Sequence, residues 1–203
     1  MSSGEPRFLA ARSDPVRRAF RLARDAHDGD ERKGDGSPFI THPVRVAELL
    51  AGEGFGDEVI AAALLHDVVE KSDRTLGDVA DAFGTDVAEL VAAMTEDDAI
   101  EGYEERKDAH REQVAEAGRG ATAIYVADKL ANLRDMRRLY SRVGESAADR
   151  FTAPTLDARV RAWRRDASMA ARIDPGLPLL AQLRGELAAL ERQRASARER
   201  SAS

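Results

Sequence analysis

Residues 59–70 read VIAAALLHDVVE, and this stretch decides the expected fold. An uncharged apolar run from Val59 to Leu65 leads directly into His66 and Asp67. Because the run contains three alanines, it favours a buried helix over a strand. We therefore predict a central buried helix that extends from Asp57 to about Lys71.

The rest of the chain is rich in Ala, Leu, Arg, Glu and Asp, which also favours helices. The predicted fold class is all-α, a single bundle domain of about eight helices over residues 1–190. The last two helices could close the core or pair subunits into a homo-oligomer. Residues 191–203 are poor in apolar side chains, so we expect a frayed or disordered tail. Further helices are expected at residues 15–26, 43–51, 76–83, 86–94, 101–118, 122–140, 155–172 and 179–195, with a polar loop at 27–40.

The composition limits the location and the partners of the protein. Apolar residues make up 43% of the 203 residues and charged residues 33%, and the net charge of −6 argues against a nucleic-acid partner. No apolar run approaches the roughly 18 residues of a membrane span, and the N-terminus lacks the apolar core of a secretion signal. The absence of cysteine excludes disulfides, thiolate nucleophiles and Cys-based metal sites. We expect a cytoplasmic protein with no membrane partner.

His66 and Asp67 stand where the apolar run ends. Burying an aspartate without a partner costs several kcal/mol, so this position calls for a cation or a hydrogen-bond network. Glu70 follows four residues after His66, which in a continuous helix places it on the same face. One helix would then direct an imidazole and two carboxylates into one volume.

Two more side chains extend this candidate site. His42 precedes Pro43 at a predicted helix start, and Asp128 interrupts the apolar face of the helix predicted over residues 122–140. Together with His66 and Asp67 they form a set of nitrogen and oxygen donors without sulfur. Such a set suits Mn²⁺ better than Zn²⁺ or Mg²⁺, with positions left for water and a substrate phosphate.

The order His42, His66-Asp67, Asp128 resembles the signature of HD-domain metal-dependent phosphohydrolases. The surrounding sequence is similar to the hydrolase domain of RelA/SpoT homologues, especially the stand-alone small alarmone hydrolases, over residues 18–138. The chain has no room for a synthetase domain, so the resemblance implies a hydrolase-only protein. The matching segments are AHDGDERKGDGSPFITHPVRVAELL (26–50), AAALLHDVVE (61–70), FGTDVAELVAAMT (83–95), EERK (104–107) and VADKLANLRDM (126–136).

The resemblance implies Mn²⁺-dependent removal of the 3′-pyrophosphate of (p)ppGpp, which gives GDP or GTP and pyrophosphate. Glu70 would orient or deprotonate the attacking water. Asn132 would hold the substrate near its ribose and phosphates, and Arg32 and Lys33 would receive the guanine base or its phosphates. The residues that the resemblance implies as Mn²⁺ ligands are His42, His66, Asp67 and Asp128.

Lys71 departs from the family pattern, which commonly has Asp after the glutamate at position 70. This change could lower the rate or redirect the substrate, unless Asp73 substitutes for the missing carboxylate. Two alternatives therefore stay open: an HD-domain hydrolase of another phosphorylated nucleotide, and a degenerate module that binds a nucleotide without turnover.

Several other polar residues have less specific expectations. Lys129 and Arg134 could add positive charge around the pocket. We expect His27 to have a structural role through hydrogen bonds of its ring, and we expect His110, in a charge-rich segment, to face solvent.

Overall fold

The computed structural model describes residues 5–150 and 155–202 and confirms an all-α fold. Over these residues the chain forms ten α-helices, two 3₁₀ helices and no strand. Their bounds are η1 (Arg7–Ala11), α1 (Asp14–Ala26), α2 (Thr41–Gly52), α3 (Asp57–Leu65), α4 (Val68–Lys71), α5 (Leu76–Phe83), α6 (Thr85–Met94), α7 (Tyr103–Glu116), α8 (Gly118–Val143), η2 (Gly144–Arg150), α9 (Leu156–Ile173) and α10 (Pro178–Ala202).

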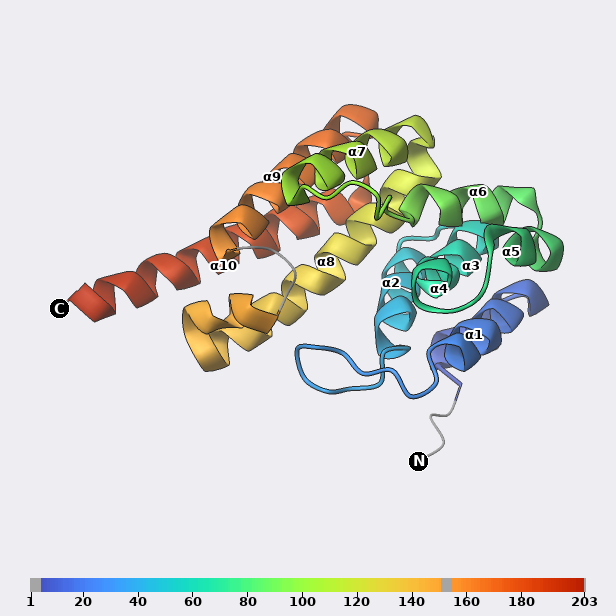
Figure 1. The fold of residues 1–203 in the computed structure, drawn as a ribbon, viewed down its shortest axis with the longest axis horizontal. Coiled ribbons are helices and arrows are strands. Elements are labelled where there is room, and N and C mark those ends of the chain that lie inside the picture. The colour runs from blue at the N-terminus through green and yellow to red at the C-terminus, as the bar shows by residue number, and fades with distance from the viewer. Residues whose placement is uncertain (1–4, 151–154, 203) are drawn as a thin grey trace.

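Helix α8 is the central element of the fold (Figure 1). It crosses the middle of the molecule, with α1 to α6 on one side and α7, α9 and α10 on the other, and it packs against α2, α3, α6, α7, α9 and α10. Ile124, Tyr125, Leu130 and Leu133 are completely buried along it. A helix surrounded in this way carries Asp128 into the interior, where the carboxylate is nearly inaccessible to solvent.

The predicted central helix exists, but it ends earlier than expected. Every residue from Ile60 to Leu65 is buried, and α3 stops at Leu65. His66 and Asp67 form a turn before α4 begins, so the expectation of one helix through Lys71 was wrong. The physical reason is a side-chain bond: His66 Nδ1 lies 2.7 Å from the carbonyl oxygen of Ala63. In an uninterrupted helix, that oxygen would pair with the N–H of Asp67.

The two C-terminal helices complete the core, which was one of the two roles expected for them. Helix α10 packs along both α8 and α9. The expected frayed tail after residue 190 is instead a continuation of α10 as far as Ala202, while Ser203 lies outside the described residues. Buried Arg194 holds this end of the helix through Glu145 (2.9 Å) and Asp157 (2.7 Å). The buried core residues of these helices include Trp163, Leu179, Leu183, Leu187 and Leu190.

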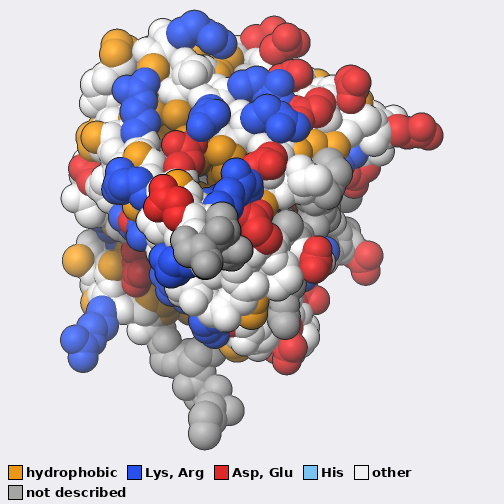
Figure 2. Space-filling view, turned by 90° about the vertical axis from the view of Figure 1, so that its left-hand side faces the viewer, with side chains coloured by type: hydrophobic (Ala, Val, Ile, Leu, Met, Phe, Trp, Pro, Cys, Tyr) orange, Lys and Arg blue, Asp and Glu red, His pale blue; other side chains and the backbone are white. Residues whose placement is uncertain are grey.

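The surface carries charges of both signs. Figure 2 views the molecule from the end where α10 finishes, and there Lys and Arg side chains are interspersed with Asp and Glu. The large apolar side chains exposed in the described part of the chain are Leu76, Val143 and Ile173, each on a different helix. Single exposed apolar residues of this kind are ordinary for a protein surface. Among the described helices, none combines the length and the apolar character needed to cross a bilayer.

Candidate active site

A pocket of about 880 Å³ lies against α8. Its walls come from the loop between α1 and α2, the start of α2, the turn at residues 66–67, α4, the end of α6 with Glu96 after it, α7, α8 and α9. This volume is at the upper end of the range for small-molecule sites, so the pocket can hold a nucleotide. The lining holds equal numbers of basic and acidic side chains, and the basic ones can meet the phosphates of an anionic ligand. These basic residues are Arg32, Lys33, Lys71, Lys107, Lys129, Arg138, Arg142 and Arg159.

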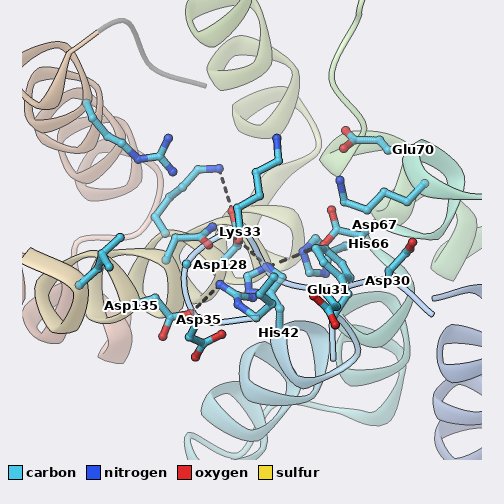
Figure 3. Close-up of a pocket in the computed structure, with 18 of the residues that line it drawn as sticks. Asp30, Glu31, Lys33, Asp35, His42, His66, Asp67, Glu70, Asp128 and Asp135 are labelled. Atoms are coloured by element: carbon cyan, nitrogen blue, oxygen red, sulfur yellow. Dashed lines mark hydrogen bonds and ion pairs between the residues drawn. The ribbon is translucent and has the colours of Figure 1, made fainter. Parts of the chain in front are cut away.

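The pocket contains the histidines and aspartates singled out in the sequence (Figure 3). His42, His66 and Asp128 each direct one donor atom into a group whose members lie within 4.8 Å of one another. Asp67 Oδ2 adjoins this group, 3.3 Å from His66 Nε2 and 3.8 Å from His42 Nε2. The first turn of α2, the turn after α3 and the middle of α8 thus bring residues distant in sequence to one point.

The protonation of the two imidazoles fits a cation in this cluster. A carbonyl oxygen can only accept, so the bond to Ala63 places the His66 proton on Nδ1. In the neutral ring, the Nε2 lone pair of His66 then faces a carboxylate oxygen of Asp67. Burial lowers the pKa of His42, which favours its neutral form as a ligand. Two imidazole nitrogens and two carboxylate oxygens in one cluster, without sulfur, are a donor set that fits a divalent metal ion.

Asp128 is held in its ionised form by its neighbours. Lys129 Nζ lies 2.8 Å from Asp128 Oδ2, and Asn132 Nδ2 donates to Oδ1 at 2.6 Å. Burial alone would raise the pKa of Asp128, but Lys129 and His42 hold it well below its usual value. Asn132 lines the pocket, and its amide also orients Asp128 from one turn further along α8. Arg134 does not line the pocket as expected: it contacts Glu186 and Gln182 on α10.

Glu70 also lines the pocket, but it is held apart from the cluster. Its Oε1 accepts a hydrogen bond of 2.8 Å from the backbone N–H of Glu96. The three residues are not on one helix, because α3 ends before His66, but all three line the same pocket as expected. Figure 3 shows the Glu70 carboxylate standing away from Asp67 and His66. Burial raises the pKa of Glu70 above the ordinary value of 4.5. A carboxylate of this kind is suited to accept and release a proton.

The loop between α1 and α2 supplies Arg32 and Lys33 to the pocket. Arg32 also reaches α8, where its Nη2 lies 2.6 Å from Asp135 Oδ2. His27 at the start of the loop stays outside the pocket and is buried, with its ring 4.8 Å from that of Phe39. Neither of its ring nitrogens has a hydrogen-bond partner among the described residues, so the expected hydrogen-bonding role was wrong.

Of the two residues in question after Glu70, Lys71 lies in the pocket wall and Asp73 lies outside it. Lys71 lines the pocket, and its Nζ lies 5.1 Å from the centre of the Phe39 ring. Asp73 is exposed and is not part of the lining. Asp73 therefore does not substitute for a carboxylate at position 71.

A second charged group in the pocket was missed in the sequence. Glu96 lies 3.3 Å from Arg106 and from His110 Nδ1, and it also pairs with Lys107. His110 was expected to face solvent, but it is only 4% exposed and contributes to the pocket wall. The signal that could have revealed this face is the i, i+3, i+7 spacing of Lys107, His110 and buried Val114. The many charges of α7 concealed that pattern.

The contacts of Glu96 give a prediction about stability. Burial would raise the pKa of Glu96, but its contacts with His110 and Lys107 hold it well below its ordinary value of 4.5. A carboxyl with a lowered native pKa stabilises the fold above its unfolded pKa and loses this contribution as the pH falls. We expect Glu96→Gln to lower the free energy of unfolding by about 1–3 kcal/mol at pH 7. The difference from the wild type should shrink below pH 4.5.

Urea unfolding at several pH values between 7 and 3 measures this difference. Glu101→Gln, at an exposed glutamate just before α7, is the matched control and should change stability by less than about 0.5 kcal/mol. A deficit for Glu96→Gln of the same size at every pH would contradict the assignment.

With the site described, the chain can be compared with known proteins. The HD-domain family profile matches residues 19–153, a range that includes the four clustered side chains. The chain belongs to the HD-domain family. An HD-domain protein of solved structure, a metazoan ortholog of SpoT reported to hydrolyse ppGpp and to play a role in starvation responses, superposes with a TM-score of 0.68. It is 30% identical, and the match covers 90% of this chain and 97% of that one, which confirms the resemblance to the SpoT homologues.

Two curated relatives carry names that describe an activity. The human guanosine-3′,5′-bis(diphosphate) 3′-pyrophosphohydrolase MESH1 is 44% identical over 120 residues, which make up 58% of this chain and 66% of the relative. The bifunctional (p)ppGpp synthase/hydrolase SpoT of Escherichia coli K12 is 43% identical over 97 residues, or 48% of this chain and 14% of SpoT. The chain thus spans just under two thirds of the length of human MESH1.

Proposed function

We propose that this protein is a Mn²⁺-dependent hydrolase that removes the 3′-pyrophosphate of ppGpp and pppGpp, giving GDP or GTP. The observation that carries the proposal is the convergence of His42, His66 and Asp128 within a pocket large enough for a nucleotide. Basic side chains of the lining, Lys33 among them, can meet the phosphates of such a substrate. The names of the relatives that share this region point to the same reaction.

Four residues would hold the ion. Two imidazole nitrogens and two carboxylate oxygens without sulfur suit Mn²⁺. When bound, such an ion supplies two effects: it lowers the pKa of water and it neutralises charge on phosphate oxygens. The proposed ligands are His42, His66, Asp67 and Asp128.

The other residues of the pocket have distinct tasks. Lys129 and Asn132 keep Asp128 ionised and oriented through their hydrogen bonds. Glu70, held by the N–H of Glu96, takes the proton of the attacking water. The water oxygen bonds to the phosphorus next to ribose O3′, the P–O3′ bond breaks, and O3′ takes up a proton as pyrophosphate leaves. Arg32 and Lys33 hold the nucleotide during this displacement.

The test is the fate of ppGpp with and without Mn²⁺. Purified protein is incubated with ppGpp, and GDP and pyrophosphate are quantified separately. We expect equal amounts of both products with Mn²⁺ and neither after chelation. GTP, which has no 3′-phosphate, serves as the control and should stay intact.

Two outcomes would contradict the proposal. Orthophosphate release from other nucleotides, with ppGpp left intact, would indicate a hydrolase of another substrate. Binding of ppGpp and Mn²⁺ without any product would indicate a module that has lost turnover.

A further inference from the structure

Asp135 on α8 lines the pocket, and its carboxylate pairs with three arginines. Its carboxylate accepts from Arg32 (2.6 Å), from Arg45 on α2 (3.0 and 3.2 Å) and from Arg138 on α8. The Asp135 side chain is 12% exposed and that of Arg32 is 10% exposed. An ion pair that is sheltered from solvent to this degree holds both side chains in one orientation, whereas an ion pair in open solvent does so only weakly.

The Asp135–Arg32 pair connects the pocket loop to the centre of the fold. Within the loop, Arg32 N–H donates to the Ser37 carbonyl (2.8 Å) and Gly36 N–H donates to the Arg32 carbonyl (2.9 Å). These bonds close the loop upon itself. The side chain of Arg32, in contrast, reaches a partner 103 residues away in the sequence. Asp135 therefore fixes where this loop lies relative to α8, along which the candidate metal cluster is built.

The same pair determines which part of Arg32 can meet a ligand. Hydrogen bonds from a guanidinium to a carboxylate lie in the plane of the guanidinium. The bond to Asp135 takes one of these donors, at Nη2, and fixes the plane of the guanidinium. Its flat face is the part suited to contact a planar ring.

We infer that Asp135 is a positioning residue that holds Arg32 against the pocket wall so that its flat face receives the base of the nucleotide. This inference rests on the proposed function, because it assigns the base-binding part of the same pocket. Arg45 contributes by neutralising the second oxygen of Asp135. Lys33, at the exposed tip of the loop, has no such commitment to Asp135 and is the loop residue suited to phosphate.

The test compares the binding of two products, GDP and pyrophosphate, of which GDP alone carries a base. Asp135→Asn removes the charge and keeps the size of the side chain. We expect it to weaken GDP binding by about tenfold, the loss typical of one charge-assisted hydrogen bond. Pyrophosphate binding should stay within about twofold of the wild type. In turnover of ppGpp, KM should rise by the same factor while kcat changes little.

A double-variant cycle separates positioning of Arg32 from a general structural effect. If Asp135 acts through Arg32, adding Asp135→Asn to Arg32→Ala should weaken GDP binding no further. Asp135→Glu should recover part of the loss. Asp73→Asn, at an exposed aspartate outside the pocket, is the matched control and should bind GDP as the wild type does. Unfolding midpoints of all variants report whether each one is folded.

The inference is overturned if folded Asp135→Asn binds GDP as the wild type does. It is also overturned if the two single losses multiply in the double variant, or if pyrophosphate binding falls as much as GDP binding. These results are independent of turnover. A wild-type protein that binds GDP but leaves ppGpp intact would count against the proposed function, while the GDP comparison would still test Asp135.

Discussion

Replacing Asp128 by alanine is expected to abolish Mn²⁺ binding and to lower ppGpp turnover at least about 10³-fold. The carboxylate is buried and adjoins both His42 and Lys129. Its removal takes away a proposed ligand and leaves the Lys129 ammonium without its closest anionic partner. The loss should therefore appear in metal binding as well as in rate.

The measurement is Mn²⁺ titration followed by electron paramagnetic resonance, together with the rate at saturating Mn²⁺. Asp128→Asn is the matched variant, since it keeps the shape of the side chain and can still meet Asn132 and Lys129. It should unfold nearer to the wild type than the alanine variant does, yet share its loss of Mn²⁺ affinity. Wild-type affinity in either folded variant would exclude Asp128 as a ligand.

Replacing Glu70 by glutamine is expected to preserve Mn²⁺ binding and to lower kcat by about 10²–10⁴-fold, the usual contribution of a general base. The amide oxygen of glutamine can still accept from Glu96 N–H, so the position of the side chain should be maintained. What is lost is the ability to take up a proton. This variant should therefore keep its Mn²⁺ affinity while its turnover falls, whereas Asp128→Ala should lose both.

The pH dependence checks the same role of Glu70. A general base must be ionised, so activity should fall as the pH drops through the pKa of Glu70, which burial raises above 4.5. Stopped assays of kcat/KM from pH 4.5 to 8 should show this acid limb in the wild type. The residual activity of Glu70→Gln should lack the limb. An unchanged limb in the variant would assign the titration to another group.

Three of the four side chains were predictable from local patterns, whereas His42 entered through its position before Pro43 and through the resemblance to HD-domain hydrolases. An aspartate at the end of an apolar run, or within the apolar face of a helix such as the one at Asp128, requires a partner when buried. The sequence thus identified His66, Asp67 and Asp128 as candidates for one polar cluster. The all-α fold followed from the abundance of strong helix formers and from the apolar run before His66.

Other features depend on contacts that no local pattern records. The break after Leu65 arises from a side chain that bonds to a backbone carbonyl, His66 to Ala63, within a run that favours helix on both sides. The position of Glu70 depends on a backbone N–H 26 residues away. His110 is buried because α7 turns a charged face toward the pocket. There the Glu96 carboxylate contacts His110 and balances the charge of Lys107. Each of these is a tertiary effect that overrides the local preference.

The central claim is that His42, His66 and Asp128, with Asp67 beside them, share one Mn²⁺ ion. Anomalous diffraction from crystals grown with Mn²⁺ tests it most directly. We expect one strong peak within coordination distance of both imidazole Nε2 atoms and a carboxylate oxygen of Asp128. A saturated crystal with its Mn²⁺ peak elsewhere in the pocket, or with none at this cluster, would contradict it.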